Sequence, residues 1–139
     1  MDYRDQFGHL LAYLIASVNQ TLAAQPSLFP LNLLLTDAGK VEISVSAFEE
    51  EDETPLSEQL NSLQAGAKAK VAAGGYVASC TAWPNYADKC LVALFENANN
   101  DVLGLSIPVV RRDENLALDD ENAEPTEADV YIFPFVDDE

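Results

Sequence analysis

The chain has 139 residues, of which 48% are hydrophobic, and its 24 acidic and 7 basic side chains give a formal net charge of -17. This length and apolar content suit one core, so we expect a single domain over residues 1–139. A charge this negative repels nucleic-acid phosphates and anionic membrane surfaces, which argues against nucleic acid and membranes as partners. No apolar run approaches the roughly 20 residues that a membrane-spanning helix needs.

The N-terminal residues and the cysteines bear on the cellular compartment. Residues 10–18 are apolar enough for the core of a signal peptide, but Asp2 and Asp5 precede them where a secretory signal is positively charged. Cys80 and Cys90 are too few for a disulfide scaffold and match no zinc-site spacing. We therefore expect a cytoplasmic protein with two buried thiols.

The first half of the chain is predicted to be a helix, a hairpin and a second helix. Residues 2–24 repeat apolar side chains at the spacing of one helical face. Residues 31–48 are predicted to form a β-hairpin, because an apolar run and an alternating run flank the turn-forming residues 37–40. The second helix is expected to begin at Thr54 and Pro55 and to end at the glycines 74 and 75.

The second half is predicted to be mainly sheet. Strands are expected at 76–83, 89–96 and 102–110, with turns at 84–88 and 97–101, an acidic mobile loop at 113–129 and a last strand at 130–135. If the first of these turns closes around residues 84–86, Cys80 and Cys90 face each other within reach of a disulfide.

The element order predicts an α+β fold. We expect one antiparallel sheet of about five to six strands, with a mixed sheet as the alternative, and both helices packed on one face. The run Leu33, Leu34, Leu35 is apolar on both sides of its strand. This indicates an outer sheet face that a partner covers, and a second copy of the chain is one candidate for a homodimer through the sheet.

Few residues in the chain are suited to catalysis or metal binding. His9 is the only histidine, and no nucleophile lies near it in the predicted first helix. An EF-hand loop beginning at Asn97 fails, because Val102 and Pro108 stand where it requires glycine and glutamate. We therefore assign no catalytic residue, cofactor or metal, and we favour a protein that is not an enzyme.

Two features are candidates for binding a protein partner. The acidic run consists of Glu49, Glu50, Glu51, Asp52 and Glu53. Together with the acidic segment 113–129 it would attract a basic protein and speed the encounter. Trp83 and Tyr86 belong to the predicted hairpin tip Trp83-Pro84-Asn85-Tyr86, where exposed aromatic side chains make good interface anchors. Trp83 could instead close the end of the core.

The order of elements and one stretch of sequence resemble a group of small acidic bacterial proteins. These share an N-terminal helix, a Phe-Pro element like Phe29-Pro30, a hairpin, an acidic loop, a second helix and a sheet. Their hairpin is similar to Leu33-Leu34-Leu35-Thr36-Asp37-Ala38-Gly39-Lys40-Val41-Glu42. The resemblance implies the α+β fold and brings no activity and no functional residues with it.

The leading hypothesis is a non-catalytic acidic protein that binds a basic protein, as an inhibitor or immunity-type protein does. Three alternatives remain open. One is a small-ligand-binding protein or enzyme with a pocket between helices and sheet. The others are a nucleic-acid mimic and a structural homo-oligomer.

Overall fold

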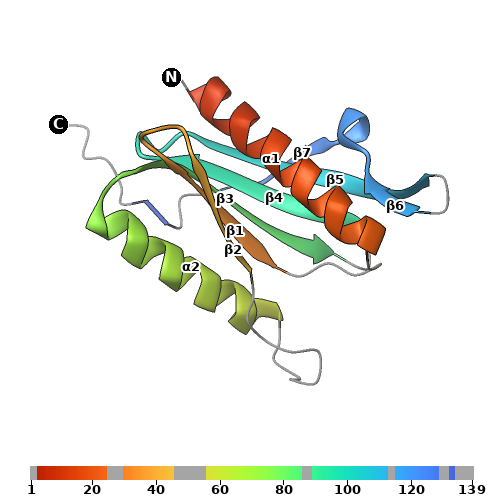
Figure 1. Ribbon diagram of the computed structural model, residues 1–139, viewed down its shortest axis with the longest axis horizontal. Coiled ribbons are helices and arrows are strands. Elements are labelled where there is room, and N and C mark those ends of the chain that lie inside the picture. Colours follow the sequence, from red (N-terminus) through yellow and green to blue (C-terminus); the bar gives the residue numbers. More distant parts are fainter. Residues whose placement is uncertain are drawn as a thin grey trace.

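The computed structural model describes residues 3–24, 30–45, 56–85, 89–112, 115–128 and 132–133. In chain order the elements are helix α1 (Tyr3–Ala24), strands β1 (Leu31–Thr36) and β2 (Val41–Val45), helix α2 (Leu56–Ala73), strands β3 (Tyr76–Asn85), β4 (Cys90–Asn97), β5 (Val102–Arg112) and β6 (Asn115–Leu118), the 3-10 helix η1 (Asp120–Asn122) and strand β7 (Glu124–Thr126). The predicted α+β class is confirmed (Figure 1).

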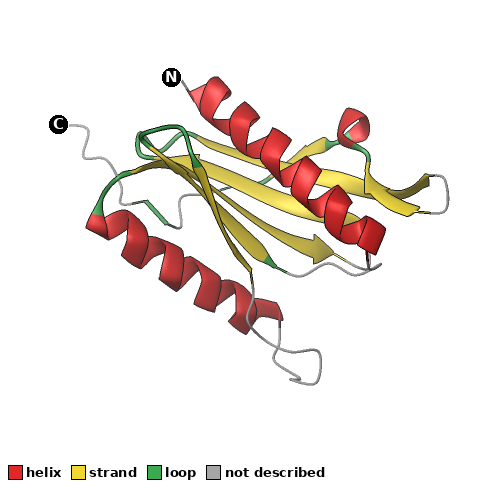
Figure 2. Ribbon diagram, in the orientation of Figure 1, coloured by secondary structure: helices red, strands yellow, loops and turns green. Residues whose placement is uncertain are grey.

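All strands belong to one antiparallel sheet (Figure 2). Their order across the sheet is β2-β1-β3-β4-β5-β6, and β7 also pairs with β5. The predicted antiparallel sheet is thus confirmed, with β6 and β7 sharing the outer edge of β5. The described residues contain no helix that is long and apolar enough to cross a membrane.

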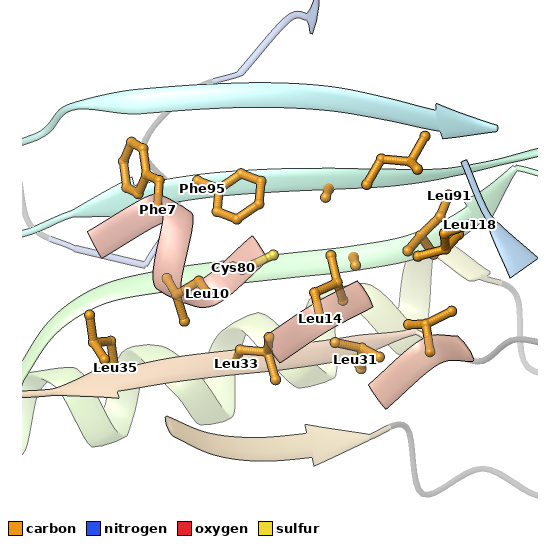
Figure 3. Packing of buried hydrophobic residues seen from close by; sticks show 14 of the residues in the cluster. Phe7, Leu10, Leu14, Leu31, Leu33, Leu35, Cys80, Leu91, Phe95 and Leu118 are labelled. Atoms are coloured by element: carbon orange, nitrogen blue, oxygen red, sulfur yellow. The ribbon is translucent and has the colours of Figure 1, made fainter. Parts of the chain in front are cut away.

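Helix α1 covers one face of the sheet and forms the main hydrophobic core with it. Leu10 and Leu14 of the helix are fully buried against Leu33 of β1, Cys80 of β3 and Phe95 of β4 (Figure 3). These strand residues share one face because side chains alternate along a strand. Each buried leucine or phenylalanine contributes about 1.5–3 kcal/mol, so this cluster is the main source of stability.

Helix α2 packs on the opposite face, so the expectation that both helices share one face is wrong. Leu34 of β1 points away from Leu33 and packs with Ala67 and Val71 of α2. Strands β2 and β3 run parallel on either side of β1, and the connection through α2 crosses the face that α1 leaves open. The apolar side chains on both sides of β1 therefore face two helices of the same chain, and no partner is needed to explain them.

The acidic segment after β5 is not the mobile loop that its composition predicts. In its described part, 115–128, it folds back along β5 as β6, η1 and β7. Leu118 provides the reason, since it is buried in the core beneath α1. The strand expected at 130–135 is described only at Ile132 and Phe133, which form a bend.

Candidate functional site

Trp83 lies inside strand β3 rather than at its end, beside a turn. Strand β3 continues to Asn85, so Trp83 pairs with Val92 and is half-buried on the face of the sheet that α2 occupies. The other residues predicted to bind a partner lie outside the described residues, namely Glu49, Glu50, Glu51, Asp52, Glu53 and Tyr86. The structure therefore places one of the seven candidates and leaves their grouping a prediction.

The two cysteines do not face each other. Cys80 pairs with Phe95 and Cys90 pairs with Asn85, so the hairpin closes farther along the chain than expected. The observed pairing is shifted from the expected one by an odd number of residues, so the two cysteine side chains also point to opposite faces of the sheet. Both thiols are free and buried, and burial raises the pKa of Cys80 far above its ordinary range.

The residues first considered for metal binding are used within the fold. Asn97 Oδ1 accepts hydrogen bonds from the backbone N–H groups of Asn99 and Asp101, at 3.0 and 2.9 Å. Asn97 Nδ2 donates to Gln6 Oε1 of α1 at 3.0 Å. Asn97 therefore fixes the β4–β5 turn and ties it to α1. Within the described ranges, no three His, Cys, Asp or Glu side chains are grouped as a metal site would require, and His9 is exposed on α1.

A buried carboxylate holds Ile132 and Phe133 against the sheet. Glu96 is 3% exposed, and its Oε1 accepts hydrogen bonds from the backbone N–H groups of Ile132 and Phe133, at 2.7 and 2.8 Å. Ile132 and Phe133 pack with Leu34 and Ala67 in the cluster beneath α2. The sequence contains one hint of this role, because an acidic residue inside an apolar strand needs partners if it is buried.

After β7 the chain crosses β5 at Gly104. A Cβ atom at Gly104 would lie 2.5 Å from the carbonyl oxygen of Thr126 and 2.8 Å from that of Glu127. The backbone after β7 therefore passes directly over Gly104, on the α2 side of the sheet. A residue without a side chain is required there because both close atoms belong to backbone.

A buried polar cluster lies on the α2 face of strands β1 and β3. Asn32 Nδ2 donates to Ser79 Oγ and Thr81 Oγ1, both at 3.0 Å, and to the backbone oxygen of Cys80 at 3.3 Å. Asn32 Oδ1 is buried and has no hydrogen-bond partner among the described residues. A buried acceptor without a partner is unusual in folded proteins, which makes this cluster a candidate polar site.

Strand β2 forms one end of the sheet and exposes apolar side chains. Ile43 is 44% exposed and Val45 is 58% exposed. They lie beside Leu33 and Leu31 on the α1 face, but α1 packs mainly on β1, β3, β4 and β6, and these two side chains stay exposed. The sequence alone could not single out these two residues, since their exposure depends on the order of strands.

Comparison with protein-family models, with curated proteins and with solved structures gives no match for this chain. Its charge, its exposed edge strand and its buried polar groups are therefore the features from which a function has to be inferred.

Proposed function

We propose that this protein is a non-catalytic cytoplasmic binding protein whose partner is a basic protein. The observation that carries the proposal is the net charge of -17. A basic protein is attracted to such a chain, and their association is fast at low ionic strength and slower as salt screens the charges. An inhibitor or immunity-type protein for a basic enzyme is one form that this role takes.

The folded acidic segment supports electrostatic recognition. Glu121, Glu124 and Glu127 are exposed along η1, β7 and the residue after it, and we call these three residues the acidic edge. Because their backbone is already ordered, a partner meets these charges without the entropic cost of fixing a loop. The acidic run 49–53 adds further negative charge to the chain.

Two other observations support the proposed compartment and an anchoring role. The free thiols of Cys80 and Cys90 suit a reducing compartment such as the cytoplasm. Trp83 is partly exposed, and we propose it as an anchor together with Tyr86.

A second candidate function, binding of a small polar ligand, is favoured by the Asn32 cluster. A ligand that donates a hydrogen bond would satisfy Asn32 Oδ1 beside the hydroxyl groups of Ser79 and Thr81. A thermal-shift screen of polar metabolites against the wild type and Asn32→Leu tests this role. A ligand that stabilises the wild type alone would favour it over the binding of a protein.

The test of the leading proposal begins with capture from a lysate of the native host, followed by washes at low and then high salt. Each basic protein released by salt is then purified, and its association rate with this chain is measured against ionic strength. A triple variant with Gln at positions 121, 124 and 127 should slow association, whereas Glu58→Gln on α2 serves as the exposed single-charge control.

The proposal predicts association that slows steeply as salt increases and that slows further in the triple variant. Failure to retain any basic protein at low salt would contradict it. So would a purified complex whose association rate is independent of salt.

A further inference from the structure

We propose that β2 is the docking site of the partner, which adds an extended segment of its own to the free edge of the sheet. The proposal rests on the function proposed above and specifies where and how the basic partner binds. Four features carry it: the backbone geometry of β2, its exposed side chains, the contrast with the other end of the sheet, and charge.

The backbone of β2 presents hydrogen-bonding groups at its outer edge. Thr36 N donates to Lys40 O at 2.8 Å, which identifies this pair as hydrogen-bonded. Bonded and non-bonded pairs alternate in an antiparallel ladder, so Glu42 and Ser44 direct their backbone groups toward β1. Val41, Ile43 and Val45 therefore direct theirs outward, where no described strand pairs with them.

The side chains of these outward-facing residues form an apolar row on the α1 face. Ile43 and Val45 are 44% and 58% exposed, and Val41 is partly buried. Proteins usually protect an edge strand with a charge, a proline, a bulge or a covering element. On this face β2 has none of these among the described residues, and an added strand would extend the apolar row with its own side chains.

The opposite end of the sheet is closed in a way that β2 is not. The backbone N–H of Leu118 in β6 donates to Asn19 Oδ1 of α1 at 2.8 Å. Asn19 of α1 thus accepts the hydrogen bond from a backbone N–H that points outward from the β6 edge. At the β2 end, Ile43 and Val45 stay exposed and no described strand pairs with the outer edge, so the two ends differ in their readiness to accept a strand.

Charge selects the occupant. Glu42 is exposed on the α2 face of β2. A second copy carries the same net charge of -17, and the repulsion between the two chains opposes self-pairing. A segment that alternates apolar residues with lysine or arginine matches the apolar row on one face and Glu42 on the other.

The experiment uses the full chain and a short, end-blocked peptide in which valine and lysine alternate, with fluorescence anisotropy as the readout. Ile43→Pro removes an outward N–H while the ladder between β1 and β2 stays intact, and circular dichroism checks the fold. We expect binding to weaken about tenfold or more. Leu103→Lys is the control for Ile43→Lys, because Leu103 is also an exposed strand residue, at 36%.

The outcomes separate this inference from the proposed function. Weaker peptide binding in Ile43→Pro and Ile43→Lys, with Leu103→Lys like the wild type, supports strand addition at β2. Equal peptide binding by all variants overturns strand addition at β2. It is also overturned if the Ile43→Pro variant binds a captured basic partner as well as the wild type does. In both cases the proposed function stands. A wild-type dimer that Ile43→Lys converts to a monomer also overturns it, since a second copy would occupy the edge. If no basic protein is captured at all, the proposed function falls and this inference falls with it.

Discussion

The carboxylate of Glu96 and the backbone N–H of Ile132 form a buried hydrogen bond of 2.7 Å across 36 positions of sequence. Phe133 N donates to the same oxygen, so one acidic side chain on β4 satisfies two backbone donors of the C-terminal segment. Replacing this side chain should loosen the attachment of Ile132 and Phe133 to the sheet.

We expect Glu96→Ala to lower the free energy of unfolding by about 3 kcal/mol, because two buried N–H groups lose a charged acceptor. Glu96→Gln keeps an oxygen at the same position and should cost about 1 kcal/mol. Urea unfolding of the two variants measures both values. An alanine variant within about 0.5 kcal/mol of the wild type would show that the anchor contributes little.

Gly104→Ala should destabilise the protein by about 1–3 kcal/mol, because its Cβ would meet the backbone oxygens of Thr126 and Glu127. Gly66→Ala is the matched control, since a Cβ in the middle of α2 has nothing within 4 Å. There the same substitution should stabilise the helix by about 1 kcal/mol. Thermal unfolding of both variants tests this pair, and two shifts of the same sign would disprove the crossing at Gly104.

Cys80 should be unreactive in the folded protein. Its thiol is fully buried and burial raises its pKa, so almost no thiolate is present near neutral pH. In a Cys90→Ala background, iodoacetamide should label Cys80 only after denaturant is added. Labelling of the native protein would contradict the burial, and a disulfide formed by the wild type under mild oxidation would contradict the register of β3 and β4.

Tyr76 should titrate above its ordinary pKa of 10.0. Its hydroxyl donates to Glu42 Oε1 at 2.9 Å, and this hydrogen bond, with partial desolvation and the charge of Glu42, raises the pKa of Tyr76. Because the folded pKa is the higher one, the stabilisation from this bond is complete below about pH 10 and is lost as the pH rises through the folded value.

Absorbance titration of the phenolate measures this shift, with Tyr76→Phe identifying the step that belongs to Tyr76. Glu42→Gln removes the charged acceptor and should return the Tyr76 midpoint toward its ordinary value. An unchanged midpoint in Glu42→Gln would rule out Glu42 as the cause.

Local periodicity predicted much of the fold. The apolar spacing in α1 and the alternation in β2 are strong patterns, and the turn at residues 37–40 joins β1 to β2 as expected. Periodicity does not say which face of a sheet a helix covers, so the position of α2 could not be derived from it. The strands β6 and β7 are too short, and too rich in acids, for their alternation to stand out.

The candidate site was less predictable, because it depends on contacts between distant parts of the chain. Pro84 and Asn85 suit a turn by composition, but they belong to β3 and pair with Leu91 and Cys90 of β4. Trp83 therefore lies inside β3 rather than at its end. The exposure of Ile43 follows from strand order, and the role of Glu96 follows from a segment that arrives 36 positions later.

Strand β1 contributes side chains to both hydrophobic clusters, with Leu33 facing α1 and Leu34 facing α2. Neither cluster can come apart without disturbing the backbone that supports the other. We therefore expect the α1 and α2 sides to unfold in one cooperative transition, with the same midpoint whichever side a probe reports. A ligand that stiffens the edge of the sheet next to β1 would then raise the unfolding temperature of the whole molecule.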